Sequence, residues 1–194
     1  LMILALPNDY YRNVESIYVY PTTIFSPESS IGFFEVRTTP VRGPMPILGE
    51  AHHSGPVVLV WDAVKKETRH PEHGHNVVYH EFAHKLDMLD GSADGTPPLT
   101  TPEDYQRWSD VCSKEYLELC GKVKHGKPTF FDSYAATDEA EFFAVVTEYF
   151  FSKPENMKHH HPKLYQVLQD FYRQDPAQKV FTNQLLKTEP KSIY

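Results

Sequence analysis

The stretch that decides the fold is His80-Glu81-Phe82-Ala83-His84, which places two imidazoles one helical turn apart with a carboxylate beside the first. At about 3.6 residues per turn, His80 and His84 project from the same face of a helix, so both can bind one tetrahedral Zn²⁺. Glu81 points to the flank of that face, where its carboxylate can polarise a water molecule as a general base. The stretch therefore predicts a helix that carries a metallohydrolase site.

The predicted helix runs over residues 76–89, with Asn76 as its N-cap, and has two chemically distinct sides. At about 100° per residue, His80, His84 and Asp87 gather on one side, opposite an apolar side made of Val78, Phe82, Leu86 and Leu89. A solvated polar face is the alternative interpretation. The polar side is not made of interchangeable Lys and Glu, however, and the pattern favours metal binding.

A catalytic zinc site also needs a third protein ligand and an open position for water. In the metzincin pattern this ligand stands six residues after the second histidine, with a glycine three residues after that histidine. Those positions hold Asp90 and Asp87, which excludes the pattern. A carboxylate from a separate helix is the alternative. Asp87 is then either a residue that orients a ligand imidazole or a surface carboxylate, and the sequence leaves both open.

Two glutamates of a later predicted helix are the candidates for that carboxylate. Glu141 and Glu148 are seven residues apart, so they share a helix face, and they are set among apolar residues. An isolated carboxylate in such surroundings is costly unless it pairs or binds a metal. Glu141 could instead take part in capping, with Asp138 as N-cap, and Glu148 could instead orient a ligand histidine. The residues alone do not rank the two.

Other acidic and histidine residues are assigned to the surface. The predicted helix over residues 101–121 has an apolar stripe, and its acids lie opposite that stripe or on its flank: Glu103, Asp110, Glu115 and Glu118. We expect His159-His160-His161 to form an exposed loop. His52-His53 falls in a segment rich in Pro and Gly, residues 39–55, which has the composition of a loop.

The pattern along the chain predicts one α+β domain over residues 1–194, with a small N-terminal sheet followed by helices. Residues 1–74 are mainly strands and loops, residues 75–176 are the helical part with the metal site, and residues 177–194 are a polar tail. Strands are predicted at 17–20, 31–36 and 57–61, and helices at 76–89, 101–121, 138–151 and 162–174. The strand at 57–61 is either an edge strand that borders the cleft or a fully buried strand.

Composition limits the class of protein. The chain has 194 residues, a net charge of −7 and no run of Lys or Arg, which argues against binding to nucleic acid or to an anionic membrane. Cys112 and Cys120 are separated by roughly 12 Å of helix rise, too far for a mutual disulfide, and reduced thiols fit a cytoplasmic location. Position 1 is leucine rather than methionine, which is consistent with a fragment of a longer polypeptide.

Two motifs, in order, resemble the Mlc titration factor A family of zinc peptidases. The first is HEFAHKLD at residues 80–87. The second is YAATDEAEFFAV at residues 134–145, followed by EYFF at residues 148–151. Gly55-Pro56-Val57-Val58-Leu59 precedes both. The similarity extends from the first predicted strand to Pro176, which is most of the chain.

This resemblance implies a zincin-like fold and a gluzincin-type aminopeptidase, with a catalytic core similar to that of anthrax lethal factor. It implies that His80, His84 and Glu141 bind one Zn²⁺ ion, that Glu81 is the catalytic base, and that Tyr134 donates a hydrogen bond in the transition state. Such family members are cytoplasmic and act on peptides. Asp87 and Glu148 remain candidates for orienting the ligand histidines.

The resemblance also implies an alternative function. The family name reflects binding to a glucose-responsive transcriptional repressor, so a regulatory binding protein with secondary peptidase activity is the competing hypothesis. Family members usually carry an additional N-terminal helical segment that this chain lacks. The tract at residues 67–75, which contains His70, His73 and His75, is not part of the family motif, and we expect it to shape a pocket wall.

Overall fold

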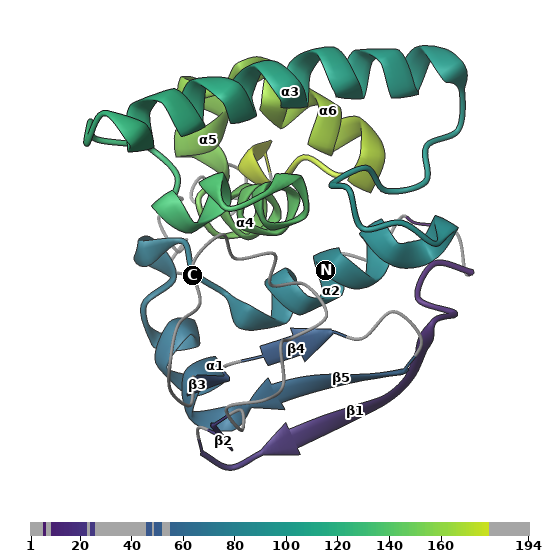
Figure 1. The fold of residues 1–194 in the computed structure, drawn as a ribbon, viewed down its shortest axis with the longest axis vertical. Coiled ribbons are helices and arrows are strands. Elements are labelled where there is room, and N and C mark those ends of the chain that lie inside the picture. The colour runs from purple at the N-terminus through teal and green to yellow at the C-terminus, as the bar shows by residue number, and fades with distance from the viewer. Residues whose placement is uncertain are drawn as a thin grey trace, which may run out of the picture.

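The computed structural model describes residues 6, 9–22, 24–25, 46–47, 49–51 and 55–178, which form a small sheet and a set of helices (Figure 1). The fold is α+β, as predicted. The predicted strand at 31–36, His52-His53 and residues 179–194 of the predicted tail lie outside the described residues.

Within the described residues, the main sheet has the strand order β1-β5-β4, and a separate pair is formed by β2 and β3. Strand β1 runs parallel to β5, whereas β4 runs antiparallel to it. The bounds are β1 (Val14–Tyr20), β2 (Ile24–Phe25), β3 (Pro46–Ile47), β4 (Gly49–Ala51) and β5 (Gly55–Val60). Strands β3 and β4 lie within the segment that was predicted to be a loop.

Strand β5 is the central strand of this sheet, and its residues from Val57 to Val60 are buried. The alternative that it is an edge strand bordering a cleft is therefore wrong, and the alternative of a buried strand is confirmed. Among the described strands, β4 occupies the edge nearer the predicted metal-binding helix. Continuous apolar character is typical of a strand covered on both faces, which is why periodicity alone could not place β5.

The described residues contain six α-helices and three short 3₁₀ helices. The α-helices are α1 (Trp61–Arg69), α2 (Val77–Asp87), α3 (Pro102–Lys124), α4 (Glu139–Ser152), α5 (Pro154–His160) and α6 (Pro162–Tyr172). The 3₁₀ helices are η1 (Pro71–His73), η2 (Met88–Asp90) and η3 (Ser133–Ala136). None of these helices combines the length and the apolar character that a membrane crossing requires.

The four predicted helices correspond to α2, α3, α4 and α6, but α1 and α5 were not predicted. Strand β5 ends at Val60 and Trp61 already begins α1, so the strand predicted at 57–61 is one residue too long, and the part expected to be mainly strands and loops also contains a helix. Helix α1 has nine residues and buries only Ala63, so its amphipathic signal is short. Helix α4 ends at Ser152, and Pro154 stands at the first position of α5, where proline is well tolerated.

Helix α5 also changes the environment of the triple histidine. His159 and His160 belong to its last turn rather than to a loop. His161 Nδ1 lies 2.7 Å from Glu115 Oε2 of α3, and the two side chains are only 15% and 20% exposed. Both residues were expected at the solvated surface, which is wrong because α6, which begins directly after His161, packs against α3.

Helix α2 lies between the sheet and α4, while α3, α5 and α6 cover the far side of α4 (Figure 1). Helix α4 is buried on every side from Ala140 to Phe150, because apolar side chains surround its whole circumference. The polar side of α2 thus faces another helix rather than solvent. This layering brings the two sequence motifs into contact.

Candidate metal centre

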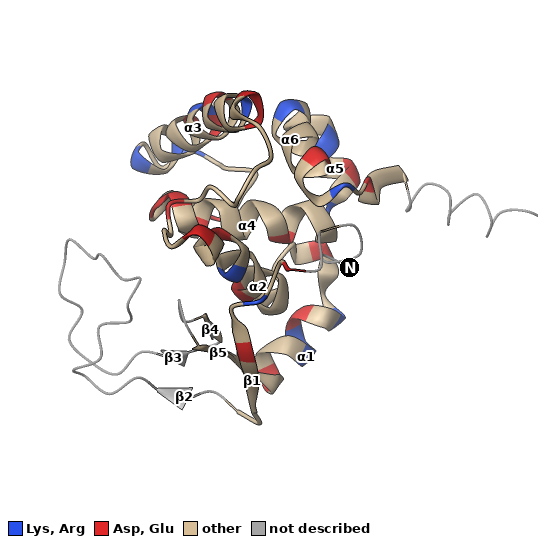
Figure 2. Ribbon diagram, turned by 90° about the vertical axis from the view of Figure 1, so that its right-hand side faces the viewer, with Lys and Arg blue, Asp and Glu red and all other residues tan. Residues whose placement is uncertain are grey.

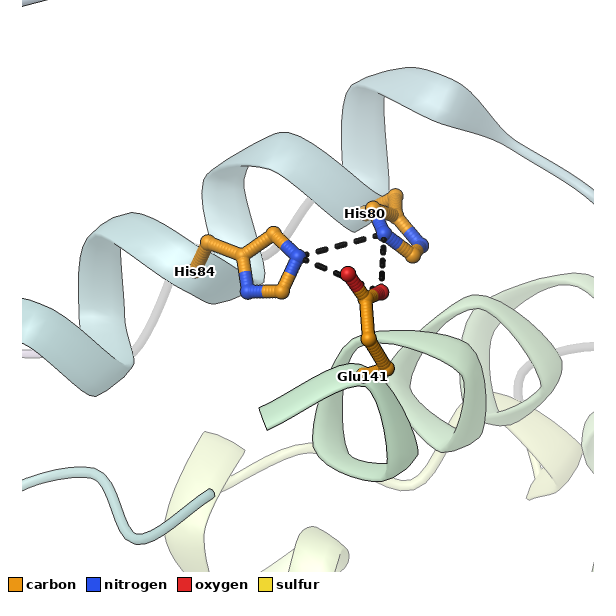
Figure 3. A group of neighbouring side chains, drawn as sticks. All are labelled: His80, His84 and Glu141. Atoms are coloured by element: carbon orange, nitrogen blue, oxygen red, sulfur yellow. Dashed lines mark hydrogen bonds and ion pairs between the residues drawn. The ribbon is translucent and has the colours of Figure 1, made fainter. Parts of the chain in front are cut away.

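Three predicted ligands converge between α2 and α4 (Figure 3). His80 Nε2 lies 2.9 Å and His84 Nε2 lies 3.5 Å from Glu141 Oε2. The two imidazole Nε2 atoms are 3.2 Å apart. Among the residues that the structure describes, these three form the one group of His, Cys, Asp or Glu side chains close enough to share a metal ion.

The spacing of these atoms fits a tetrahedral metal ion. Ligands at about 2.0 to 2.2 Å from zinc lie about 3.3 to 3.5 Å from each other when the geometry is tetrahedral. The three measured separations, 2.9, 3.2 and 3.5 Å, are close to these values. Two imidazole nitrogens and one carboxylate oxygen are also a common donor set for such an ion. The residues present therefore fit the metal that the sequence motif implies.

The centre is rich in buried negative charge. Glu81, Glu141 and Glu148 are 5%, 7% and 4% exposed, and the start of α4 carries its acidic residues beside α2 (Figure 2). Burial raises the pKa of Glu81 to about 7. Burial acts against the charged form of His80, but hydrogen bonds to Glu141 and Glu148 raise the pKa of His80 well above its usual value.

The pKa of Glu141 is shifted in the opposite direction, below its usual range. Burial would raise the pKa of Glu141, but hydrogen bonds from His80 and His84 hold that pKa well below its usual range. A divalent cation among these three residues would offset the negative charge of the buried carboxylates.

Glu148 holds the opposite edge of the His80 ring. Its Oε1 lies 2.7 Å from His80 Nδ1, and its Oε2 accepts a hydrogen bond from the backbone N–H of Asn76 at 2.5 Å. The contact at Nδ1 leaves His80 Nε2 directed at Glu141. Glu148 is therefore outside the group of atoms that could share a metal, and it contacts the ring from behind.

Asp87 lies one turn beyond His84 and is completely buried, so the interpretation as a surface carboxylate is wrong. Its Oδ2 accepts a hydrogen bond from Gly95 N at 3.0 Å. Burial raises the pKa of Asp87 to about 6, although the Gly95 hydrogen bond and the nearby His84 oppose that rise. The charge on Asp87 thus interacts with one of the two predicted histidine ligands.

Glu141 belongs both to the candidate metal centre and to the first turn of α4. Asp138 is the N-cap of α4, and its Oδ1 accepts a hydrogen bond from Glu141 N at 2.8 Å. The backbone of Glu141 is used for capping, while its side chain turns towards His80 and His84. Capping and convergence on the histidines are therefore compatible at this position.

Tyr134 reaches the same carboxylate from η3. Its hydroxyl donates to Glu141 Oε1 at 2.9 Å, and its ring centroid lies 6.0 Å from that of His80. Asp132 holds the start of η3, because its Oδ1 accepts a hydrogen bond from Tyr134 N at 2.7 Å. The side chain is 48% exposed, so Tyr134 forms the solvent-facing rim of an otherwise buried centre.

Two residues that the sequence did not single out also contact this region. A β-carbon at Gly49 of β4 would overlap the Glu81 carboxylate and come within 2.7 Å of its Cδ. Glu67 of α1 accepts a hydrogen bond from Val77 N at 2.6 Å, at the start of α2. No local pattern marks either residue, because each acts across the interface between two separate elements.

The chain was compared with known proteins. A family model described as glucose-regulated metallo-peptidase M90 matches residues 1–173. An uncharacterised protein of Synechocystis is 38% identical over 181 residues, which cover 90% of this chain and 63% of that protein. Proteins named Mlc titration factor A are also similar. The one from Edwardsiella ictaluri is 38% identical, over 76% of this chain and 56% of its own length. The one from Serratia proteamaculans is also 38% identical, over 93% of this chain and 68% of its own length. The chain thus spans between 56% and 68% of the length of these three relatives.

Proposed function

This chain belongs to the family of glucose-regulated metallo-peptidases M90, and we propose that it is a zinc-dependent peptidase of the zincin-like, gluzincin type. The observation that carries the proposal is the convergence of His80 Nε2, His84 Nε2 and Glu141 Oε2, with separations between 2.9 and 3.5 Å. Glu81 follows the first of these ligands and lies buried beside them.

We assign His80, His84 and Glu141 as the zinc ligands and Glu81 as the general base. A zinc ion held by these residues would supply Lewis acidity, which lowers the pKa of a bound water molecule to about 7. Glu81 would take a proton from the attacking water and could deliver it to the leaving amine as the peptide C–N bond breaks.

Tyr134 is assigned as the hydrogen-bond donor to the oxyanion, a contribution of about 3 kcal/mol for one such donor. Its hydroxyl now donates to Glu141 Oε1, so it must turn from that oxygen to the substrate. The 48% exposure of the side chain supports this assignment, since an exposed tyrosine at the rim has room to turn.

Glu148 and Asp87 are assigned to orienting the ligand imidazoles. The contact of Glu148 Oε1 with His80 Nδ1 supports the first assignment. The second assignment rests on the complete burial of Asp87 one turn beyond His84, where Asp87 acts on His84 through its charge. A carboxylate that accepts from the second nitrogen of a ligand histidine, as Glu148 does at His80, fixes its tautomer and raises its basicity.

The substitution Glu81→Gln tests the proposal. We expect hydrolysis to fall by about 10² to 10⁴, because the base is lost, while the zinc content stays at one ion per chain. Turnover of a peptide and zinc content by mass spectrometry are measured together. The control is Glu118→Gln, since Glu118 is exposed on α3, where it forms an ion pair with Lys122. Unchanged turnover in the Glu81 variant would reject the assigned base.

The proposal includes aminopeptidase specificity in a cytoplasmic location, on the strength of the family resemblance. An aminopeptidase needs an acid that recognises the substrate amine, and Glu148 and Asp87 are speculative candidates for it. Glu148 already contacts His80 and Asn76, however, and Asp87 accepts a hydrogen bond from Gly95. Specificity is therefore tested directly, by comparing aminoacyl substrates with peptides blocked at the amino terminus. Cleavage of blocked peptides alone would reject the aminopeptidase assignment.

A second function, binding of a transcriptional regulator, is favoured by the name Mlc titration factor A that several relatives carry. The test uses purified Mlc and this protein in metal-free form and as the Glu81→Gln variant. Binding by both forms supports regulator capture that is independent of hydrolysis. Absence of binding by every form, including the wild-type protein with zinc, rejects this function and leaves the peptidase proposal intact.

A further inference from the structure

The start of α2 is held by side chains from three different places in the chain. The first backbone N–H groups of an α-helix have no partner within the helix. Here Glu148 accepts from Asn76 N and Glu67 accepts from Val77 N, while Asn76 Oδ1 accepts from Val78 N and Tyr79 N at 3.1 and 3.2 Å. Every N–H from the N-cap to the third helical residue therefore has a side-chain acceptor.

Glu67 is the acceptor that connects the start of α2 to the side of the molecule that carries the sheet. It belongs to α1, which continues directly from the central strand β5 and contacts both β5 and α2. Its Oε2 lies 2.6 Å from Val77 N. Val77 is three residues before His80, so this hydrogen bond fixes the turn from which the first predicted ligand projects.

The position of Glu67 at this helix end is electrostatically favourable. The N-terminus of a helix carries a partial positive charge, which stabilises a carboxylate placed there. Burial raises the pKa of Glu67, the Val77 hydrogen bond lowers it, the negative charge of Glu148 raises it, and His75 and His80 lower it. Glu67 thus lies within electrostatic range of both the predicted ligand and the carboxylate that orients it.

We propose that Glu67 is a positioning residue of the metal centre, which acts through the first turn of α2 to hold His80 in line with His84 and Glu141. Asn76 alone caps the N–H groups of Val78 and Tyr79, so helix formation has its own cap. Glu67 and Glu148 add something different: they fix where that first turn lies relative to α1 and α4. The inference rests on the proposed zinc site and adds a residue to it.

Zinc affinity of the full chain tests this inference without relying on peptidase activity. Glu67→Ala removes the acceptor, and Glu67→Gln keeps an oxygen acceptor but removes the charge. We expect Glu67→Ala to weaken zinc binding about tenfold or more, as removal of residues behind metal ligands typically does. Glu67→Gln should fall between this variant and the wild-type protein. Zinc Kd is measured by competition with a chromophoric chelator, and the visible spectrum of the Co²⁺-loaded protein reports ligand geometry.

Two control variants separate positioning from general destabilisation. Glu72→Ala removes an exposed carboxylate on the neighbouring η1, and we expect no change in zinc Kd. Glu115→Ala breaks the partly buried contact with His161, far along the chain from α2, and should lower the melting temperature without changing zinc Kd or the Co²⁺ spectrum. If Glu67→Ala does not fold, Glu67→Gln is compared with the same controls.

The possible results are distinct. Zinc Kd and Co²⁺ spectra equal to those of the wild-type protein in folded Glu67 variants would overturn the inference and leave the zinc site standing. A loss of affinity in Glu115→Ala as large as in the Glu67 variants would also overturn it, because the effect would then follow stability alone. A wild-type protein that binds no zinc would overturn the proposed metal centre and this inference together.

Discussion

At the level of single residues, the carboxylate of Glu81 lies against the backbone of β4. Gly49 pairs with Leu59 in the sheet, and a β-carbon at position 49 would overlap Glu81. The backbone of Gly49 is outside the left-handed region, so another residue could adopt it. The missing side chain therefore matters for space: it leaves room for the proposed base between the helix and the sheet.

Gly49→Ala should displace the Glu81 carboxylate while leaving the zinc ligands in place. We expect kcat to fall by up to about 100-fold, because a displacement on the order of 1 Å at a reacting group costs about that much. Zinc Kd should not change. Both quantities are measured in parallel with Ala51→Gly, a substitution on the same strand that adds no atoms. A Gly49→Ala protein with the kcat of the wild-type protein would contradict the contact.

At the level of elements, Gly95 lies against three helices, α2, α3 and α4. Its N–H donates to Asp87 at the end of α2, and its carbonyl accepts from Trp108 Nε1 of α3 at 3.1 Å. A β-carbon here would come within 2.7 Å of the carbonyl carbon of Glu139, at the start of α4. The backbone of Gly95 has a φ of +78°, which favours glycine. The loop after α2 thereby fixes the helices that carry both motifs.

Gly95→Ala should lower the free energy of unfolding by about 3 kcal/mol or more, because left-handed strain and overlap with the Glu139 backbone both contribute. Gly126→Ala is the matched comparison. Gly126 has a φ of +61°, but a β-carbon there would meet nothing within 4 Å, so only about 1 kcal/mol of strain is expected. Urea unfolding of the two variants measures the difference. An equal decrease in the free energy of unfolding for Gly95→Ala and Gly126→Ala would show that the overlap with the Glu139 backbone contributes nothing.

At the level of the whole molecule, the metal centre lies at the boundary between the sheet side and the helical side. Helix α2 carries two of the assigned ligands, α4 carries the third, η3 carries Tyr134, and α1 contributes Glu67. In the chain, α3 separates α1 and α2 from η3 and α4, so these two groups of elements meet only after folding. A metal that binds here should therefore stabilise the packing of α2 against α4, besides serving any reaction.

Removal of zinc should lower the stability of the wild-type protein measurably. A ligand that binds only the folded state stabilises it by about 4 kcal/mol when its concentration is 1,000 times Kd. We expect a lower melting temperature with a chelator than with saturating zinc, measured by calorimetry. His84→Ala should melt at the same temperature under both conditions. Coincident transitions for the wild-type protein in chelator and in zinc would contradict a folded-state metal site.

Several features followed from the sequence alone because they depend on neighbours along the chain. The spacing of His80 and His84 places both on one side of α2, Asn76 caps that helix, and Thr101 with Pro102 marks the start of α3. The order of the two motifs also predicted the family, which the match over residues 1–173 confirms. Local hydrogen bonding and helical periodicity are sufficient for such predictions.

Other features were decided only by tertiary packing. Residue patterns did not rank Glu141 and Glu148, which share a helix face, although the family resemblance implied Glu141. The position of α4 beside α2 places Glu141 on His80 Nε2 and Glu148 on His80 Nδ1. Asp87 is buried because the loop at Gly95 closes over it. Gly49 and Glu67 act on α2 from a strand and a helix that had no clear pattern. These outcomes depend on contacts between separate elements, and the free energy of such contacts is set by the assembled fold, which local patterns do not record.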